Sequence, residues 1–227
     1  MLRKILILLL CTFHLQNFTY ANTNEIWISP KSNEYSRLST GLAGSNITII
    51  SAEQIASDYS KSLPEIFERY AGIDVRSLYS GVDGGNATID MRGFGEAAGS
   101  NSLMLLNGRR LNDLDMSSVD FTNIPKESIE RIEIVRGSSA ATIYGSGAVG
   151  GSINVVTKTD ELDNSIEISN GSYNSLKSGF FLNTKINENN RFSISGKLIS
   201  SDTYRDSADY DNEAFLLNYS FNNEDFI

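Results

Sequence analysis

Residues able to carry nucleophilic, redox or metal chemistry are scarce in this chain. It contains one cysteine, Cys11, and one histidine, His14. Both precede Ala21, where we expect a leader peptide to be cleaved, so the mature chain should have neither a thiol nor an imidazole. That composition excludes thiolate-ligated zinc, disulfides, Ser-His-Asp triads and Cys-His dyads. An enzyme is accordingly the least favoured class of function.

A glycine-rich stretch offers the nearest match to a known ligand loop. Residues 145–150, GSGAVG, fit the G-x-G-x-x-G pattern of dinucleotide sites. A dinucleotide loop follows a strand and opens a helix. Here the predicted helix, 138–144, comes first and the predicted strand, 152–157, comes after. We therefore interpret these glycines as structural, giving positive φ or close backbone approach. They are Gly145, Gly147, Gly150 and Gly151.

Aspartates cluster in the segment from Ser201 to Asn212, which we expect to be the longest connection between the last strands. Hard cations such as Ca²⁺ take about six to eight oxygen ligands, often from aspartates. A solvated acidic loop explains the same residues and is the favoured interpretation. The candidate calcium ligands are Asp202, Asp206, Asp209 and Asp211. The formal charge of the whole chain, −9, argues against nucleic acid as a partner.

Residues 1–21 have the three parts of a secretory signal peptide. Arg3 and Lys4 form a basic start, a short apolar run covers residues 5–11, and Ala21 ends an A-x-A-like site. The run is too short to cross a bilayer as a helix, so we expect export and cleavage after Ala21. A mitochondrial-type signal or a membrane anchor is the alternative. Residues 22–44 are mostly polar, and we expect them to form a mobile segment.

Residues 45–160 carry the signals of one compact α+β unit. Ser51 and Gln54 form a capping-box pattern, and Pro64 stands in the first turn of a second helix. Asn107-Gly108 between apolar runs predicts a hairpin. Strands are expected over 46–50, 73–76, 88–92, 103–106, 109–111, 131–136 and 152–157, helices over 52–57, 63–70 and 138–144, and a short turn or helix over 124–129.

After Asp160 the pattern changes to segments of about ten residues with one apolar and one polar face. The apolar set is Ile166, Ile168, Phe180, Leu182, Ile186, Phe192, Ile194, Leu198, Phe215, Leu217, Tyr219 and Phe221. Two structures fit: strands that cross an outer membrane with this face toward lipid, or a soluble antiparallel sheet that buries it. The secretory signal favours the membrane, so residues 161–227 are predicted to be the first strands of an incomplete β-barrel.

Three stretches resemble TonB-dependent outer-membrane receptors, in the order in which that family has them. They are IDMRGFG at 89–95, LMLLNGRRLND at 103–113 and IPKESIERIEIVRGSSAATIYGSGAVGGSINVVTK at 124–158. The likeness covers residues 25 to about 160 well and the later strands loosely, and the last motif is long enough to be highly specific. It implies an α+β plug domain followed by antiparallel transmembrane β-strands of an outer-membrane barrel.

The same resemblance assigns a partner-binding segment near the start of the mature chain. The residues in the place of the family's TonB box are Glu25, Ile26, Trp27, Ile28 and Ser29. Trp27 departs from the usual Val-Val-Thr form. An exposed β-branched run can add as a strand to the edge of a partner's sheet, and an unstructured leader with chance apolar residues is the alternative. We expect no room for an additional periplasmic domain between Ala21 and the box.

Two arginines and one further glycine also take their expected functions from the resemblance. Arg92 and Arg136 fall where the plug arginines of the family pair with glutamates of the barrel wall. A buried guanidinium needs such a carboxylate, whereas solvated arginines are the alternative. Gly93 belongs to the RGFG motif itself.

The implied function is active uptake of a scarce nutrient across the outer membrane of a Gram-negative bacterium. The expected ligand is a small metal chelate, such as a ferric siderophore, haem or cobalamin, and the expected partners are TonB and outer-membrane lipid. No cofactor is expected apart from the candidate calcium ion in the segment from Ser201 to Asn212. In a cobalamin-type receptor of the family, calcium orders the corresponding loop.

The length of the strand region carries a further expectation. The smallest membrane barrel needs about eight strands, and the residues after Asp160 supply about four of the necessary length. We therefore expect a truncated or fragmentary chain. A plug-only periplasmic binding protein, and a structural or adhesive barrel without energy coupling, are the alternative functions.

Overall fold

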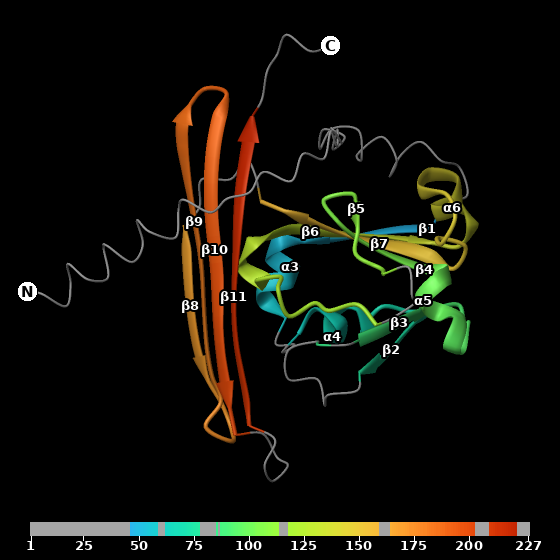
Figure 1. Cartoon of the computed structure of the whole chain (residues 1–227), viewed down its shortest axis with the longest axis horizontal. Helices are drawn as coiled ribbons and strands as arrows, with labels where there is room; N and C mark the ends of the chain where they lie inside the picture. The colour runs from blue at the N-terminus through green and yellow to red at the C-terminus, as the bar shows by residue number, and fades with distance from the viewer. Residues whose placement is uncertain are drawn as a thin grey trace, which may run out of the picture. The chain divides into compact units, whose positions relative to one another are not determined.

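The computed structural model of the chain describes residues 46–58, 62–77, 85, 87–113, 118–158, 164–202 and 209–221. Two bodies of secondary structure follow one another in these residues. The first is an α+β unit of short elements over residues 46–158. The second is a sheet of longer strands, β8 to β11, which we call the long-strand sheet (Figure 1).

The α+β unit contains β1 (Asn46–Ser51), α3 (Ala52–Ser57), α4 (Leu63–Glu68), β2 (Ile73–Ser77), β3 (Ala87–Met91), the 3-10 turn η1 (Gly95–Ala97), α5 (Ala98–Asn101), β4 (Ser102–Leu106), β5 (Arg109–Arg110), the 3-10 turn η2 (Lys126–Ser128), β6 (Ile129–Arg136), α6 (Ser138–Tyr144) and β7 (Gly151–Thr157). Five of its strands form one sheet in the order β1-β6-β7-β4-β5, and β2 pairs with β3 separately. Within the larger sheet β4 and β7 run parallel, and the other neighbours are antiparallel.

Two local sequence signals, a helix cap and a hairpin turn, have the predicted geometry. The Ser51 hydroxyl accepts from the Gln54 backbone N–H at 3.3 Å and the Gln54 side chain accepts from the Ser51 N–H at 2.9 Å, so the capping box is confirmed. Asn107 and Gly108 both have positive φ, 52° and 78°, and Leu106 pairs with Arg109 across the turn. That geometry is the tight hairpin that the Asn-Gly pair predicts.

The five-stranded sheet has an apolar core on each face. On one face, side chains from β1, β6 and β7 pack against α3, α4, β2 and β3. The largest fully buried members of this core are Ile50, Ile55, Ile66, Phe67, Met91, Met104, Phe121, Ile129, Ile132, Ile134 and Ile153. On the other face, Leu103, Leu105 and Val135 pack against Ala140 of α6 and against Ala148. Figure 1 shows the corresponding layers, with α6 on one side of the sheet and α4, β2 and β3 on the other.

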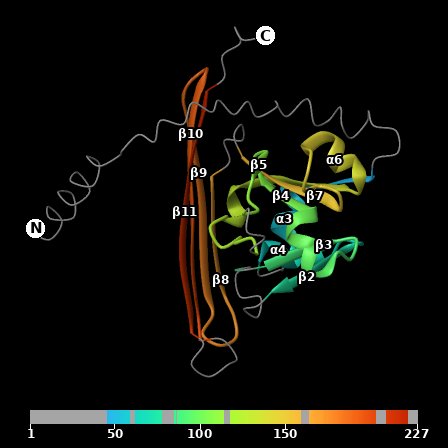
Figure 2. The ribbon, with the colours of Figure 1, turned by 45° about the vertical axis from the view of Figure 1, so that its right-hand side comes forward.

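The long-strand sheet consists of β8 (Ser165–Asn170), β9 (Leu176–Asn187), β10 (Asn190–Ser201) and β11 (Tyr210–Phe221). All neighbours are antiparallel in the order β11-β10-β9-β8, and the strands lie side by side in both views (Figures 1 and 2). A short turn joins the end of β9 at Asn187 to the start of β10 at Asn190. Among the described residues, no helix is long and apolar enough to cross a membrane.

The two faces of the long-strand sheet are reversed relative to a soluble sheet. Ile166, Leu217 and Tyr219 are 76%, 62% and 62% exposed. On the opposite face, Ser195 and Lys197 of β10 are buried, at 1% and 8% exposure. The alternative of a soluble sheet that buries its apolar face is therefore not what the structure shows. Alternating polar-inward and apolar-outward residues are the pattern of transmembrane barrel strands.

Candidate functional site

Two of the glycines singled out from the sequence, Gly150 and Gly151, lie with a third glycine, Gly137, where the ends of several elements of the α+β unit come together. We define the glycine junction as Gly137, Gly150 and Gly151. The Gly137 N–H donates to the Gly150 carbonyl at 2.9 Å, and the Gly150 N–H donates to the Asn101 carbonyl at 2.8 Å. These two hydrogen bonds join the end of β6, the start of β7 and the end of α5.

The glycine junction has no room for side chains. A Cβ on Gly150 would lie 2.7 Å from the Met91 carbonyl oxygen and 3.0 Å from that of Asn101. A Cβ on Gly151 would lie 2.5 Å from Met91 Cε and 2.7 Å from the Val135 carbonyl oxygen. Because backbone atoms cannot swing aside as a side chain can, both positions require glycine. The prediction of close backbone approach is confirmed at these two positions.

The other predicted glycines differ in what surrounds them. Gly93 and Gly145 have positive φ, 75° and 79°, and open space where a Cβ would point. Gly147 has φ 92°, and a Cβ there would overlap the guanidinium group of Arg110. These three glycines are therefore needed for their positive φ. The absence of a side chain at Gly147 also leaves space for the guanidinium group of Arg110.

Arg92 lies on the glycine junction. Its own backbone is left-handed, at φ 80°, which is uncommon for a residue with a side chain. Its guanidinium group covers Gly137, since a Cβ there would lie 2.8 Å from Arg92 Nη2. The arginine thus occupies the space that the absent side chain leaves.

Arg136 is tied down inside the α+β unit. Its Nε donates to the Ala71 carbonyl at 3.0 Å and its Nη1 donates to Thr48 Oγ1 at 2.7 Å. These bonds hold β6 to β1 and to the end of the segment after α4. Pairing of Arg92 or Arg136 with a glutamate of a barrel wall stays a prediction.

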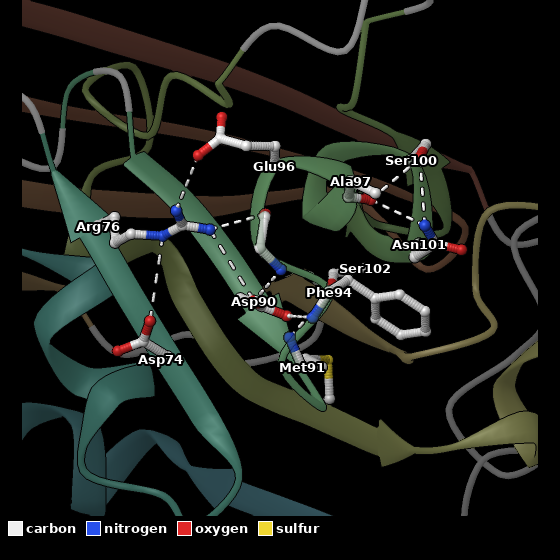
Figure 3. A network of polar contacts seen from close by, with 11 residues as sticks. Asp74, Arg76, Asp90, Met91, Phe94, Glu96, Ala97, Ser100, Asn101 and Ser102 are labelled. Atoms are coloured by element: carbon white, nitrogen blue, oxygen red, sulfur yellow. Dashed lines mark hydrogen bonds and ion pairs between the residues drawn. The ribbon is translucent and has the colours of Figure 1, made fainter.

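A buried carboxylate that sequence reasoning missed organises the turn after β3 (Figure 3). Asp90 is 4% exposed, and its two oxygens accept from the N–H groups of Phe94 at 2.9 Å and Gly95 at 2.7 Å. Hydrogen bonds to an ionised acceptor are about twice as strong as neutral ones. Asp90 therefore fixes the RGFG turn. A sequence signal existed, because an aspartate ahead of a glycine turn commonly accepts from its backbone.

Arg76 of β2 completes this arrangement from the neighbouring strand. Asp74 stands directly opposite Asp90 in the β2–β3 pair, and like charges in that position repel. Arg76 lies between them: its Nη2 is 3.9 Å from Asp90 Oδ2, and it donates to the Gly95 carbonyl at 2.7 Å (Figure 3). The guanidinium is half exposed, so its ion pairs are weak, and the bond to Gly95 is the more specific contact.

Asn112 is a second buried polar residue that the sequence did not reveal. Its Oδ1 accepts from the Met104 N–H at 2.6 Å, and its Nδ2 donates to the carbonyls of Gly99 at 3.1 Å and Ser102 at 3.0 Å. One amide thereby ties the residues after the hairpin to β4 and α5. Every polar atom of the side chain is used, as burial requires.

A third polar group lies inside the five-stranded sheet. Asn154 Nδ2 donates to Glu133 Oε2 at 3.0 Å, and Asn154 Oδ1 accepts from the Gly108 N–H at 3.0 Å. Arg131 Nε donates to the other Glu133 oxygen at 2.8 Å. This chain of bonds runs from the strand β6 across β7 to the hairpin turn, so the hairpin is held by side chains as well as by its ladder.

Two predicted sites fall wholly or partly outside the described residues. The TonB-box residues 25–29 and Asp206 lie there. The acidic connection is shorter than expected, because β11 already begins at Tyr210 and Asp211 is a strand residue. Asp202 accepts from Asn174 Nδ2 at 2.6 Å. In the part of the chain that the structure describes, no cluster of acidic, histidine or cysteine residues could hold a metal ion, and the calcium site stays a prediction.

Comparison with known proteins finds relatives among TonB-dependent receptors and transporters. Residues 42–152 match the family model of the TonB-dependent receptor plug domain. The chain is 34% identical over 125 residues to the vitamin B12 transporter BtuB of Photobacterium profundum, covering 55% of this chain and 20% of that protein. It is 37% identical over 114 residues to the BtuB of Vibrio vulnificus, covering 50% and 18%. The match thus spans about a fifth of the length of these curated relatives.

A solved structure extends the likeness beyond the α+β unit. The siderophore receptor PirA from Pseudomonas aeruginosa superimposes with a TM-score of 0.54 at 26% identity, over 79% of this chain and 32% of that one. This coverage includes more of the chain than the family model does. The α+β unit and the strands that follow it therefore occur together in a known receptor.

Proposed function

We propose, because this chain belongs to the TonB-dependent receptor family, that it is part of a receptor for energy-coupled uptake of a small metal chelate across the outer membrane. The α+β unit is the plug domain of this family, and from here on we call it the plug. The long-strand sheet corresponds to strands of the receptor barrel.

The observation that carries this proposal is the reversed sheet that follows the plug. Its exposed face is apolar, whereas its opposite face buries the polar residues Asn183, Ser193, Ser195 and Lys197 beside Phe181, Ile199 and Ala214. A sheet of this kind is stable only where its outer face meets an apolar medium. Removing apolar surface from water is favourable, and leaving it in contact with water is not. An outer-membrane location, after export by residues 1–21, accounts for that face. A periplasmic plug-only protein leaves it unexplained.

The relatives narrow the proposed ligand to two chemistries. Two are named as vitamin B12 transporters and one as a siderophore receptor, and none of these names describes an enzyme. We propose cobalamin or a ferric siderophore as the ligand of this receptor. Identity is higher to the B12 transporters, but it is confined to about a fifth of their length, so both ligands enter the test.

Energy coupling is proposed to act through residues 25–29. Ile26 and Ile28 in an otherwise polar segment suit addition to the sheet edge of TonB. A proline at Ile28 removes a backbone donor and fixes φ, which strand addition does not tolerate. The same substitution at Asn33 lies outside the box and serves as the matched control.

The experiment is uptake by cells that lack their own receptors and carry the complete receptor. Labelled cyanocobalamin and ferric siderophores are supplied separately, and binding and accumulation are measured. We expect one ligand class to accumulate, Ile28→Pro to abolish accumulation but keep binding, and Asn33→Pro to behave as the unaltered chain. Undiminished accumulation by Ile28→Pro would refute the coupling segment. Release of the protein by osmotic shock would refute the membrane location.

A further inference from the structure

One contact between the plug and the long-strand sheet joins the side chain of a glutamate to the backbone of a glycine. Glu127 lies in η2, and Gly179 is a buried residue of β9. A Cβ on Gly179 would lie 2.8 Å from Glu127 Oε2 and would overlap Oε1 and the carboxyl carbon. The carboxyl group therefore fills the volume that any side chain at position 179 would need.

A second plug residue meets the same strand close by. Lys158 Nζ lies 5.2 Å from the centre of the Phe181 ring, within the range of a cation–π contact. Phe181 is fully buried and stands two residues after Gly179, so both point to the same face of β9. Glu127 and Lys158 thus contact successive positions on one face of one strand.

The surroundings of Glu127 are poor for a charge. Glu127 Oε2 is enclosed and finds no hydrogen-bond partner among the residues that the structure describes. Burial raises the pKa of Glu127, and Glu167 of β8 acts in the same direction. A hydrogen bond from the backbone of Glu127 itself, Lys126 of η2 and Lys197 of β10 lower the pKa. Removal from water is the largest of these effects, so this place disfavours the carboxylate more than water does.

We infer that the plug docks on the long-strand sheet through Glu127, which fits into the notch that Gly179 leaves in β9, beside the contact of Lys158 with Phe181. Glu127 is a positioning residue of the docked plug. This inference goes beyond the proposed uptake function and does not depend on which ligand is carried, because it concerns only how the plug is held.

The docking contact must depend on pH. A carboxyl whose pKa is higher in the docked state than in water binds a proton on docking. Docking is therefore strongest below the ordinary pKa of a glutamate and weakens as the pH rises through the raised pKa. Glu127→Gln keeps the shape without the charge, so it should dock at neutral pH at least as well as the unaltered chain and lose the pH dependence.

The notch is tested by a double-mutant cycle in the complete receptor in outer membranes, with Glu127→Ala, Gly179→Ala and both together. Amide hydrogen exchange of residues 126–129, corrected for the intrinsic effect of pH, reports opening of η2. Each single variant should raise exchange by roughly five- to tenfold. The double variant should raise it no further, since either substitution alone already abolishes the contact between the Glu127 carboxyl group and position 179. Gly171→Ala is the matched control, because a Cβ there meets only Ser175 Cβ at 3.6 Å.

Three outcomes would overturn the inference. Gly179→Ala could leave the exchange unchanged, or its effect could add in full to that of Glu127→Ala; either result means that Glu127 does not occupy the notch. Glu127→Gln could open η2 as far as Glu127→Ala does, which would mean that the docked group is the charged carboxylate. Protection of η2 by Glu127→Gln at neutral pH, with non-additive alanine variants, supports it.

Discussion

Alanine at Gly150 places one methyl group between two backbone carbonyls of the plug. The added Cβ would lie 2.7 Å from the Met91 oxygen and 3.0 Å from the Asn101 oxygen, well inside normal contact distance. Overpacking of this kind costs about 1–3 kcal/mol. The backbone shift that the methyl group forces also lengthens the hydrogen bonds of Gly150 to Gly137 and Asn101, which adds about 1 kcal/mol each. Stiffening of the unfolded chain offsets about 0.4–1 kcal/mol, leaving a net loss of about 2–4 kcal/mol.

Two other glycines separate crowding from backbone strain. Gly93 has φ 75° but open space, so Gly93→Ala reports the cost of a left-handed alanine, about 1 kcal/mol. Gly171 has neither constraint, so Gly171→Ala should be near neutral. The expected order of destabilisation is Gly150, then Gly93, then Gly171.

The assay is urea unfolding of the chain followed by circular dichroism, with the midpoint and slope fitted for each variant. A loss of about 3 kcal/mol would remove a large share of the roughly 5–15 kcal/mol that stabilises a domain. If Gly150→Ala unfolds at the same urea concentration as Gly93→Ala, the crowding at the glycine junction does not govern stability, and the reasoning fails.

Three further outcomes are expected. Asp90→Ala should free the N–H groups of Phe94 and Gly95 and cost about 1.5–3 kcal/mol, seen as faster amide exchange at those residues; unchanged exchange would mean that the turn holds itself. Asn112→Ala should cost about 1–3 kcal/mol by leaving the Met104 N–H unpaired, measured in the same urea assay, and a neutral result would show that water replaces the amide. Millimolar calcium should protect residues 202–209 of the complete receptor from protease, and Asp209→Ala with Asp211→Ala should abolish that protection; a cleavage pattern indifferent to calcium leaves an ordinary acidic loop.

Local rules of the chain were enough to predict one helix cap and one hairpin turn of the plug. Ser51 with Gln54, and Asn107 with Gly108, act through neighbours three residues away or fewer. The pairing of β4 with β7 was not predictable in that way. It joins residues 102–106 to residues 151–155 in parallel, and no periodicity within either strand specifies a partner so distant in the sequence.

Buried polar residues were the main omission from the sequence reasoning. Residue type alone predicts that Asp90 and Asn112 are exposed to solvent, because most polar side chains are. Their function appears only when the backbone groups they serve are placed beside them. Gly150 is the opposite case: the motif indicated that a glycine was needed, while the structure identified the carbonyls of Met91 and Asn101 as the reason.

Alternation alone could not tell which face of the later strands is buried. Leu217 and Asn218 alternate in the same way in a soluble sheet and in a membrane strand, since the period is two in both. Exposure of the apolar face resolves the choice. The strand lengths agree with it, because β9, β10 and β11 have 12 residues each, and a tilted crossing needs about 9–11.

The place of β1 in the sheet bears on how a pull from TonB would act under the proposed coupling. β1 is the first described element after residues 25–29, and it is an edge strand whose sheet neighbour is β6. A pull along the chain therefore reaches β1 before the other strands that the structure describes. β6 is held at one end by Gly137 in the glycine junction, and at the other it continues from η2, where Glu127 contacts β9. Because β1 is an edge strand, its withdrawal would break only its own pairs with β6, and β6 would keep its pairing with β7.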